Sequence, residues 1–85
     1  KMDDVNIIFC RILLSSIRPE VEDAGFRVNR DASVYAYSTY AGHVGHRQFQ
    51  FAGPGGFVRE VSASNGYHAR YLGWMAFLGL EEDAI

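Results

Sequence analysis

The segment from residue 33 to residue 61 constrains the fold most, because it contains three strand-like runs separated by glycine-containing breaks. Residues 34–40 are β-branched or aromatic at most positions, a composition that suits a pleated strand and suits a helix poorly. Residues 44–51 and 57–61 follow, separated by a Gly-Pro-Gly-Gly stretch that continues neither regular structure. The segment therefore predicts an antiparallel meander.

Residues 44–51 alternate with a period of two, which predicts a strand with one dry face. One face carries Arg47, Phe49 and Phe51, and the other carries His46, Gln48 and Gln50. Which face of the sheet the helices cover decides whether the tyrosines of residues 34–40 or the phenylalanines of residues 44–51 are buried. The sequence leaves both arrangements open.

Residues 5–17 predict a helix that begins after two carboxylates, Asp3 and Asp4, although the β-branched content leaves a strand possible. One side of this helix is formed by Val5, Ile8, Phe9, Ile12 and Leu13, and the far side by Ile7, Cys10, Leu14 and Ile17. A helix that is apolar nearly all round is usually buried on two sides, one of which is often a partner. We therefore expect a homodimer through apolar helix faces.

Pro19 fits the first position of a short second helix, which Gly25 ends in a left-handed conformation, and residues 26–28 are predicted to begin a strand. Near the C-terminus, the spacing of Tyr67, Tyr71, Trp74 and Leu78 predicts a helix whose stripe packs on the sheet. Ala69, Leu72, Ala76 and Leu80 lie on the opposite side.

These elements predict one α+β domain over residues 1–85: an N-terminal helix, a three- or four-stranded antiparallel sheet and a C-terminal helix, with both helices on one face of the sheet. One cysteine excludes an internal disulfide, the start of the chain does not resemble a signal peptide, and no apolar run reaches about 18 residues. We expect a cytoplasmic protein without a membrane span.

The chemistry-bearing residues form no recognisable catalytic or metal-binding pattern. His43 and His46 would point to opposite faces of a regular strand, and no cysteine or carboxylate lies near them to complete a zinc site. Cys10 lies in the most apolar run of the chain, where a thiol is inert. We therefore expect no enzyme activity, no metal and no cofactor.

Aromatic and arginine residues dominate the predicted sheet, where Tyr35, Tyr37 and Thr39 share one face of a strand, beside Arg47 and Arg59 on its neighbours. Tyrosine and arginine are enriched at binding hot spots, and the same pair of residue types can stack on bases. The predicted contact surface consists of Tyr35, Tyr37, Tyr40, His46, Arg47 and Arg59. We expect a small non-catalytic protein-binding module, of the type that phages and mobile elements use to inhibit host machinery.

The alternative is a nucleic-acid-binding domain, because residues 26–80 carry five arginines and two acids, a formal charge of 5 − 2 = +3 within a chain of net charge −2. The order of helix, antiparallel strands and helix, and the histidine-containing loop and strand of residues 42–51, resemble double-stranded RNA-binding domains over about half of the chain. That family clamps phosphates with lysines at the start of its last helix. The corresponding residues here are Asn65, Gly66, Tyr67, His68 and Arg70.

Overall fold

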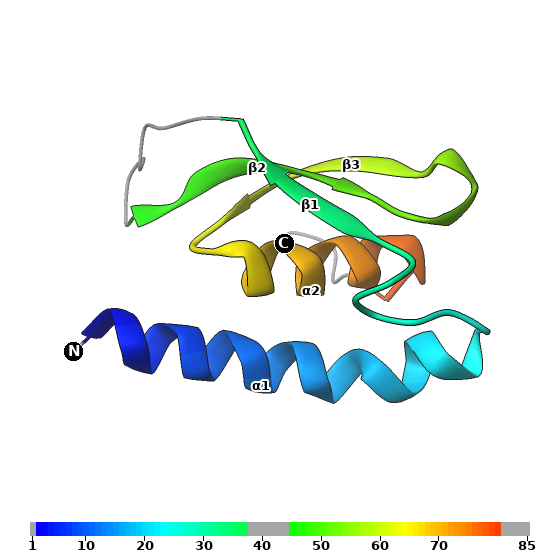
Figure 1. Ribbon diagram of the computed structural model, residues 1–85, viewed down its shortest axis with the longest axis horizontal. Helices are drawn as coiled ribbons and strands as arrows, with labels where there is room; N and C mark the ends of the chain where they lie inside the picture. Colours follow the sequence, from blue (N-terminus) through cyan, green and yellow to red (C-terminus); the bar gives the residue numbers. More distant parts are fainter. Residues whose placement is uncertain (1, 38–44, 81–85) are drawn as a thin grey trace.

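The computed structural model describes residues 2–37 and 45–80, with side chains from residue 5 onward. Its elements are helix α1 (Met2–Asp23), strand β1 (Ser33–Ala36), strand β2 (Arg47–Ala52), the 3-10 turn η2 (Pro54–Gly56), strand β3 (Val58–Ala63) and helix α2 (Gly66–Phe77). The three strands form an antiparallel sheet in the order β1-β2-β3. Helix α2 lies beneath the sheet and α1 lies beneath α2, so both helices are on one side of it (Figure 1). The α+β fold expected from the sequence is confirmed.

The predicted alternation of β2 is also confirmed, and it settles which sheet face is dry. Phe49 and Phe51 are buried against the helices, whereas Gln48 and Gln50 are exposed. Tyr35 pairs with Gln50 across β1 and β2, so it points to the exposed face with that residue. The phenylalanines are therefore the core-facing set.

Helix α1 continues through Pro19, so the prediction of a short separate helix starting there was wrong. Ile17 and Val21 on either side of the proline are fully or almost fully buried in the main core cluster. Pro19 itself and Ser15, whose carbonyl loses its intrahelical donor, are both exposed to solvent. Burial of the flanking residues thus holds the helix together where local propensity would end it.

Gly25 ends α1 in the left-handed conformation (φ 95°), as the sequence predicted. The Phe26 N–H donates to the Val21 carbonyl and the Gly25 N–H to the Glu22 carbonyl, which is the Schellman arrangement. Residues 26–28 are coil and turn rather than the predicted strand. The backbone of this connection bonds to α2 instead of a strand, because the Val28 carbonyl accepts from Trp74 Nε1 at 3.0 Å.

The prediction that the Tyr67 stripe of α2 packs on the sheet holds for Trp74 and was wrong for Tyr67. Ala69 and Gly73 face the sheet instead, because the large rings of Phe49 and Phe51 leave room only for small residues beneath them. Tyr67 lies under the Arg11 guanidinium of α1, 5.7 Å from the ring centroid. Both sides of α2 are covered, one by the sheet and one by α1, so apolar spacing alone does not tell them apart.

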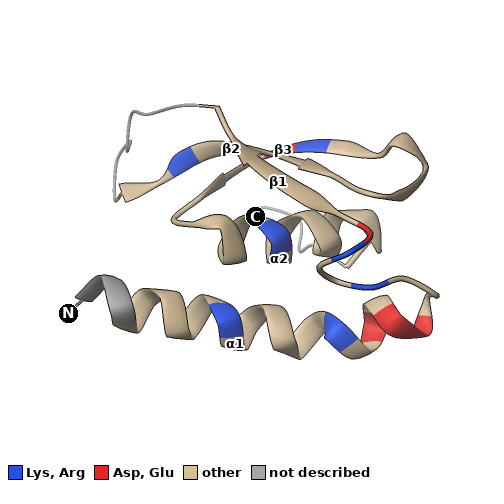
Figure 2. Ribbon diagram, in the orientation of Figure 1, with Lys and Arg blue, Asp and Glu red and all other residues tan. Residues whose placement is uncertain are grey.

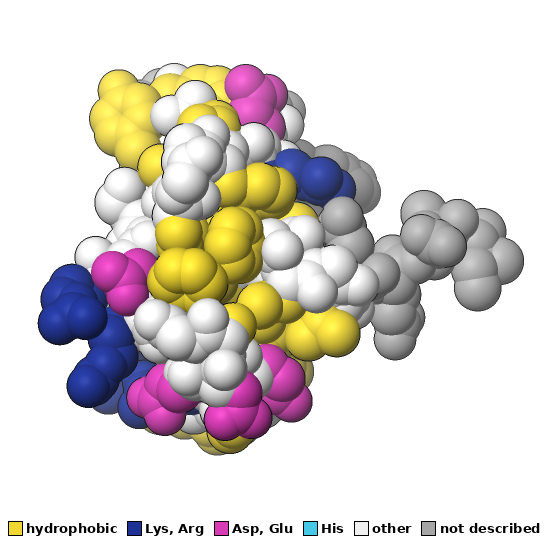
Figure 3. Space-filling model, turned by 90° about the vertical axis from the view of Figure 1, so that its right-hand side faces the viewer, with side chains coloured by type: hydrophobic (Ala, Val, Ile, Leu, Met, Phe, Trp, Pro, Cys, Tyr) yellow, Lys and Arg dark blue, Asp and Glu magenta, His cyan; other side chains and the backbone are white. Residues whose placement is uncertain are grey.

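Trp74 of α2 contacts the sheet through its ring, which lies against Phe51 at a centroid distance of 5.6 Å. Around it, Phe26, Phe57 and Phe77 pack edge-on or tilted with centroids 5.3–6.1 Å apart. Figure 3 shows the molecule from the right-hand side of Figure 1, and in this view hydrophobic side chains fill the space between the sheet and α1. The aromatic cluster joins all three layers.

Candidate functional site

The described part of the chain leaves the outer face of the sheet uncovered, because both helices lie on the opposite side (Figure 1). Its residues follow from the strand register, since directly paired residues point to the same face. The rows across the sheet are Ser33-Ala52-Val58, Tyr35-Gln50-Glu60 and, beyond the end of β1, Gln48-Ser62 with Tyr37 beside Gln48. This set is called the outer sheet face below.

Two tyrosines form the aromatic centre of the outer sheet face. The rings of Tyr35 and Tyr37 stack with centroids 6.5 Å apart and an interplanar angle of 24°. They are 65% and 45% exposed, so a large part of each ring remains available to a partner. Desolvation raises the pKa of the Tyr37 hydroxyl, and a hydrogen bond with Glu60 and the charge of that carboxylate raise it further. Tyr37 therefore stays neutral and donates toward β3.

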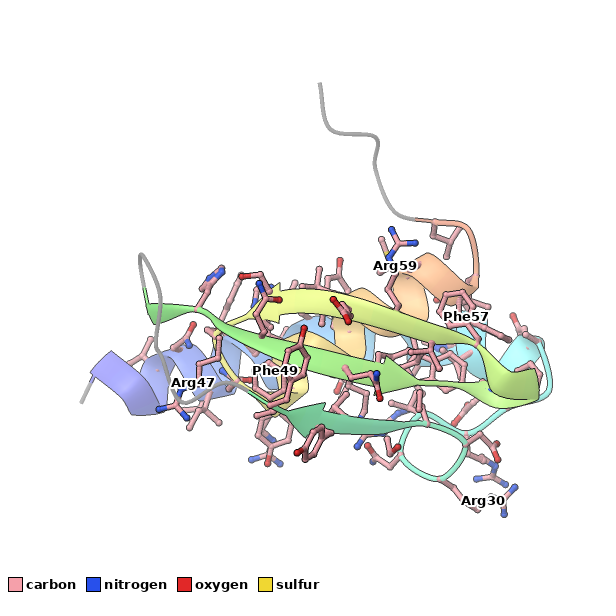
Figure 4. All side chains as sticks on the ribbon, turned by 90° about the horizontal axis from the view of Figure 1, so that it is seen from above. Arg30, Arg47, Phe49, Phe57 and Arg59 are labelled. Atoms are coloured by element: carbon pink, nitrogen blue, oxygen red, sulfur yellow. The ribbon has the colours of Figure 1, made fainter. Side chains whose placement is uncertain are left out.

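The two arginines of the predicted contact surface belong to the other face of the sheet. Arg47 pairs with Ala63 and Arg59 pairs with Phe51, and both partners are fully buried on the helix side. Arg47 and Arg59 reach solvent only because they lie at opposite margins of the sheet (Figure 4). The structure brings Tyr35 and Tyr37 together and separates them from both arginines.

The remaining two residues of the predicted surface lie elsewhere. Tyr40 is outside the described residues. His46 precedes β2 and packs edge-on against His68 of α2, with ring centroids 5.7 Å apart, so it faces the helix layer rather than the outer sheet face.

Arg18, Arg27 and Arg30 line one depression at the end of α1, and the other described arginines are spread over the molecule (Figure 2). Within the described residues the outer sheet face carries one charged side chain, the Glu60 carboxylate. Arg70, which the nucleic-acid alternative would place along phosphates, instead donates from Nη1 to the Val28 and Ala32 carbonyls, and partial burial lowers its pKa. Residues 42–44 of the segment that resembles double-stranded RNA-binding domains lie outside the described residues.

A polar cluster at the start of α2 was not predicted from the sequence. The N-terminal cap is Asn65, whose side-chain oxygen accepts from the His68 N–H at 3.0 Å. His68 Nδ1 in turn accepts from the Ser64 N–H at 3.3 Å, and Ser64 Oγ lies 3.7 Å from the Cys10 sulfur. Desolvation lowers the pKa of His68, and the charge of His46 lowers it further.

The contacts of this cluster connect the start of α2 with α1. Cys10 is 2% exposed, so its sulfur is closed to a substrate. His68 Nδ1 accepts from the Ser64 backbone N–H, and Ser64 Oγ lies 3.3 Å from the same nitrogen. Among residues 2–37 and 45–80, no three histidine, cysteine, aspartate or glutamate side chains lie close enough together to hold a metal ion.

Helix α1 carries a second exposed feature on the side that faces away from α2. Val5, Ile8, Phe9 and Ile12 are between 56% and 65% exposed, whereas Cys10, Leu14, Ile17 and Val21 are buried. The sequence identified two apolar sides on this helix, and the structure shows which one is covered.

No helix in the described part of the chain is long and apolar enough to cross a membrane. Comparisons with known proteins identify no relative: no family model matches the sequence, and no curated protein or solved structure is significantly similar to it.

Proposed function

We propose that this domain is a non-catalytic protein-binding module whose contact surface is the outer sheet face. The observation that carries the proposal is the exposed, stacked pair of Tyr35 and Tyr37 on a sheet face that no described element covers. Tyrosine supplies large contact area with few rotatable bonds and is enriched at interface hot spots. Val58, 54% exposed on the same face, extends the apolar area.

The charge of the face favours a protein partner over a nucleic acid. Glu60 repels phosphates, and the arginines that could offset it, Arg47 and Arg59, are at the margins on the other side of the sheet. A protein surface with an arginine or lysine would suit this face better. Its cation would stack on the Tyr35-Tyr37 pair and bond to the Glu60 carboxylate.

Three narrower expectations belong to this proposal. The partner is a component of host machinery that a phage or mobile element inhibits, an analogy based on small size and missing catalytic groups. The site of action is the cytoplasm, where the single, buried Cys10 stays reduced. The chain also forms a homodimer through α1, which leaves the outer sheet face on the opposite side of the molecule for this partner.

The test compares capture of a partner from host lysate by the wild-type domain and by the double variant Tyr35→Ala/Tyr37→Ala, followed by affinity measurement with the purified partner. Because two hot-spot side chains are removed, we expect the dissociation constant to rise at least about tenfold. Both side chains lie on the solvent-exposed face of the sheet, so the circular dichroism spectrum should not change.

Tyr67→Ala is the matched control, since Tyr67 is a tyrosine of similar exposure, 42%, on α2 under Arg11. It should bind the partner as the wild type does. Equal binding by the double variant and the wild type would contradict the proposed surface. Recovery of nucleic acid, with affinity that falls steeply as salt is raised, would support the alternative instead.

A further inference from the structure

A basic depression lies where α1 meets the connection that leads to β1. It has a volume of about 300 Å³ and is lined by Arg18, Glu22, Arg27, Val28, Asn29 and Arg30. Figure 3 shows arginine side chains gathered along one margin of this end of the molecule, next to acidic side chains. The lining has three positive charges and one negative charge, a formal balance of 3 − 1 = +2.

The backbone around this depression is held in place by the core. Val28 is 3% exposed, and its carbonyl accepts from Trp74 Nε1 at 3.0 Å and from Arg70 Nη1 at 3.1 Å. Asp31 closes the turn, because its carboxylate accepts from the Arg27 N–H at 2.7 Å and its own N–H donates to the Arg27 carbonyl at 3.0 Å. The backbone that carries the arginines of the connection is therefore fixed before a ligand binds, which lowers the entropic cost of binding.

The guanidinium groups of the lining are available to an anion. Within the described part of the chain, neither Arg18 nor Arg27 forms an ion pair. Arg30 Nε lies 3.8 Å from Asp31 Oδ1, a long contact in which the arginine side chain is 76% exposed, and Arg30 points outward from the connection (Figure 4). An anion could thus accept charge-assisted hydrogen bonds from these arginines without breaking a strong native contact.

A phosphate monoester fits this lining better than other common anions. It has a charge of about −1.5 to −2 near pH 7 and three acceptor oxygens, whereas a carboxylate has one charge and fits a single guanidinium fork. Each phosphate of a nucleic-acid backbone also has one charge. Arg70 and Asp31 next to the depression add one charge of each sign, and neither Glu20 nor Asp23 lines it, so the balance of +2 matches a dianion.

We propose that this depression binds a phosphate monoester group through Arg18, Arg27 and Arg30, the group being carried by a phosphorylated side chain or by a small molecule. The site consists of residues of α1 and the connection, whereas the outer sheet face consists of strand residues and Tyr37. The inference therefore does not depend on the proposed function, and either can fail without the other.

Titration of the isotope-labelled domain with glycerol 3-phosphate, followed by NMR, tests the site. We expect saturable shifts of the amide signals of residues 27–30, with a dissociation constant below about 5 mM at low ionic strength. Arg18→Gln/Arg27→Gln should raise this constant at least about tenfold, because two charge-assisted contacts are removed. Both side chains are exposed, so the circular dichroism spectrum should not change.

Two further variants separate this site from general attraction of anions. Arg11→Gln/Arg47→Gln removes the same charge outside the depression and should change the dissociation constant less than about twofold. Glu22→Gln removes the repulsive charge of the lining and should lower the constant about two- to fivefold. An unchanged constant in Arg18→Gln/Arg27→Gln, an equal rise in the control, or no binding to the wild type up to about 20 mM would overturn the proposal.

The class of ligand is tested with dimethyl phosphate and acetate, which are both monoanions. Each should bind at least about fivefold more weakly than glycerol 3-phosphate, and equal affinity would overturn the assignment to a monoester.

A short peptide with one phosphoserine distinguishes the two sources of the group. Tighter binding of this peptide than of glycerol 3-phosphate would assign the site to phosphorylated side chains, and equal affinity would assign it to small phosphate esters. Equal binding of the unphosphorylated peptide would overturn the proposal.

Discussion

An alanine at Gly73 would place its Cβ inside the ring of Phe51, which is fully buried beneath the sheet. Phe51 also contacts Trp74 and Phe57, so the ring has no free direction in which to move. Gly73→Ala gains about 1 kcal/mol of helix propensity, but overpacking of this kind costs about 1–3 kcal/mol or more. We expect a net loss of roughly 1–2 kcal/mol in the free energy of unfolding by chemical denaturation.

Gly66→Ala is the matched control in the same helix. Its Cβ would meet Val34 Cγ2 at 3.7 Å, an ordinary contact, so the free energy of unfolding should stay within about 0.5 kcal/mol of the wild type or rise. If both variants lost stability equally, the effect would arise from the backbone of α2 and not from the Phe51 ring. The sequence alone does not show that a phenylalanine ring lies against Gly73.

At the scale of elements, α2 depends on a neutral His68. The Ser64 N–H donates to His68 Nδ1, and a protonated ring could not accept that hydrogen bond. A cation in the first turn of a helix is also unfavourable by about 0.3–1 kcal/mol. Both effects agree with the lowered pKa of His68, which has desolvation as its main cause and the charge of His46 as the second.

The lowered pKa of His68 determines how the stability of the domain depends on pH. Because the pKa of His68 in the folded state is below the ordinary value of 6.5, the unfolded state binds more protons, and stability rises with pH. The contribution of neutral His68 to the free energy of unfolding is fully present above pH 6.5. It is lost as the pH falls through the pKa of His68 in the folded state. The expected loss in the free energy of unfolding between pH 7.5 and pH 5.5 is less than about 1 kcal/mol, because His68 is partly exposed.

Denaturation of wild type and His68→Gln at both pH values measures this difference. Glutamine can accept a hydrogen bond from the Ser64 N–H but does not titrate. His68→Gln should therefore show the smaller loss at acidic pH. An equal loss in both proteins would mean that other groups cause it.

Element boundaries and faces were predictable where one periodicity dominates. The alternation of β2 and the left-handed Gly25 were predicted because a strand with one dry face and a helix end with glycine have few alternatives. The sequence did not predict that α1 continues through Pro19, nor which side of α2 faces the sheet. Both depend on which neighbouring layer buries a residue, and spacing along the chain does not contain that information.

At the scale of the whole molecule, stacking α2 between the sheet and α1 decides where the candidate surfaces lie. It buries Phe49 and Phe51, leaves the Tyr35-Tyr37 pair outside, and turns one apolar side of α1 to solvent. The sequence predicted the tyrosines as a contact surface. It joined Arg47 and Arg59 to them, although the alternation of residues 44–51 puts Arg47 on the face of Phe49 and Phe51. The register between the strands places the tyrosines on the opposite face from both arginines, and one strand's pattern does not contain that register.

The three layers are tied together by Arg70, whose Nη1 donates to the Val28 and Ala32 carbonyls in the connection from α1 to β1. Val28 also accepts from Trp74, but Ala32 would lose this donor in Arg70→Met. Methionine keeps most of the side-chain packing, and an unsatisfied, largely buried carbonyl costs about 1–3 kcal/mol. We expect a loss of that size in the free energy of unfolding by urea denaturation.

Arg47→Met at the exposed margin of the sheet is the control and should change the free energy of unfolding by less than about 0.5 kcal/mol. Equal losses would show that arginine-to-methionine substitution is itself destabilising, and that the bonds from Arg70 do not hold the connection in place.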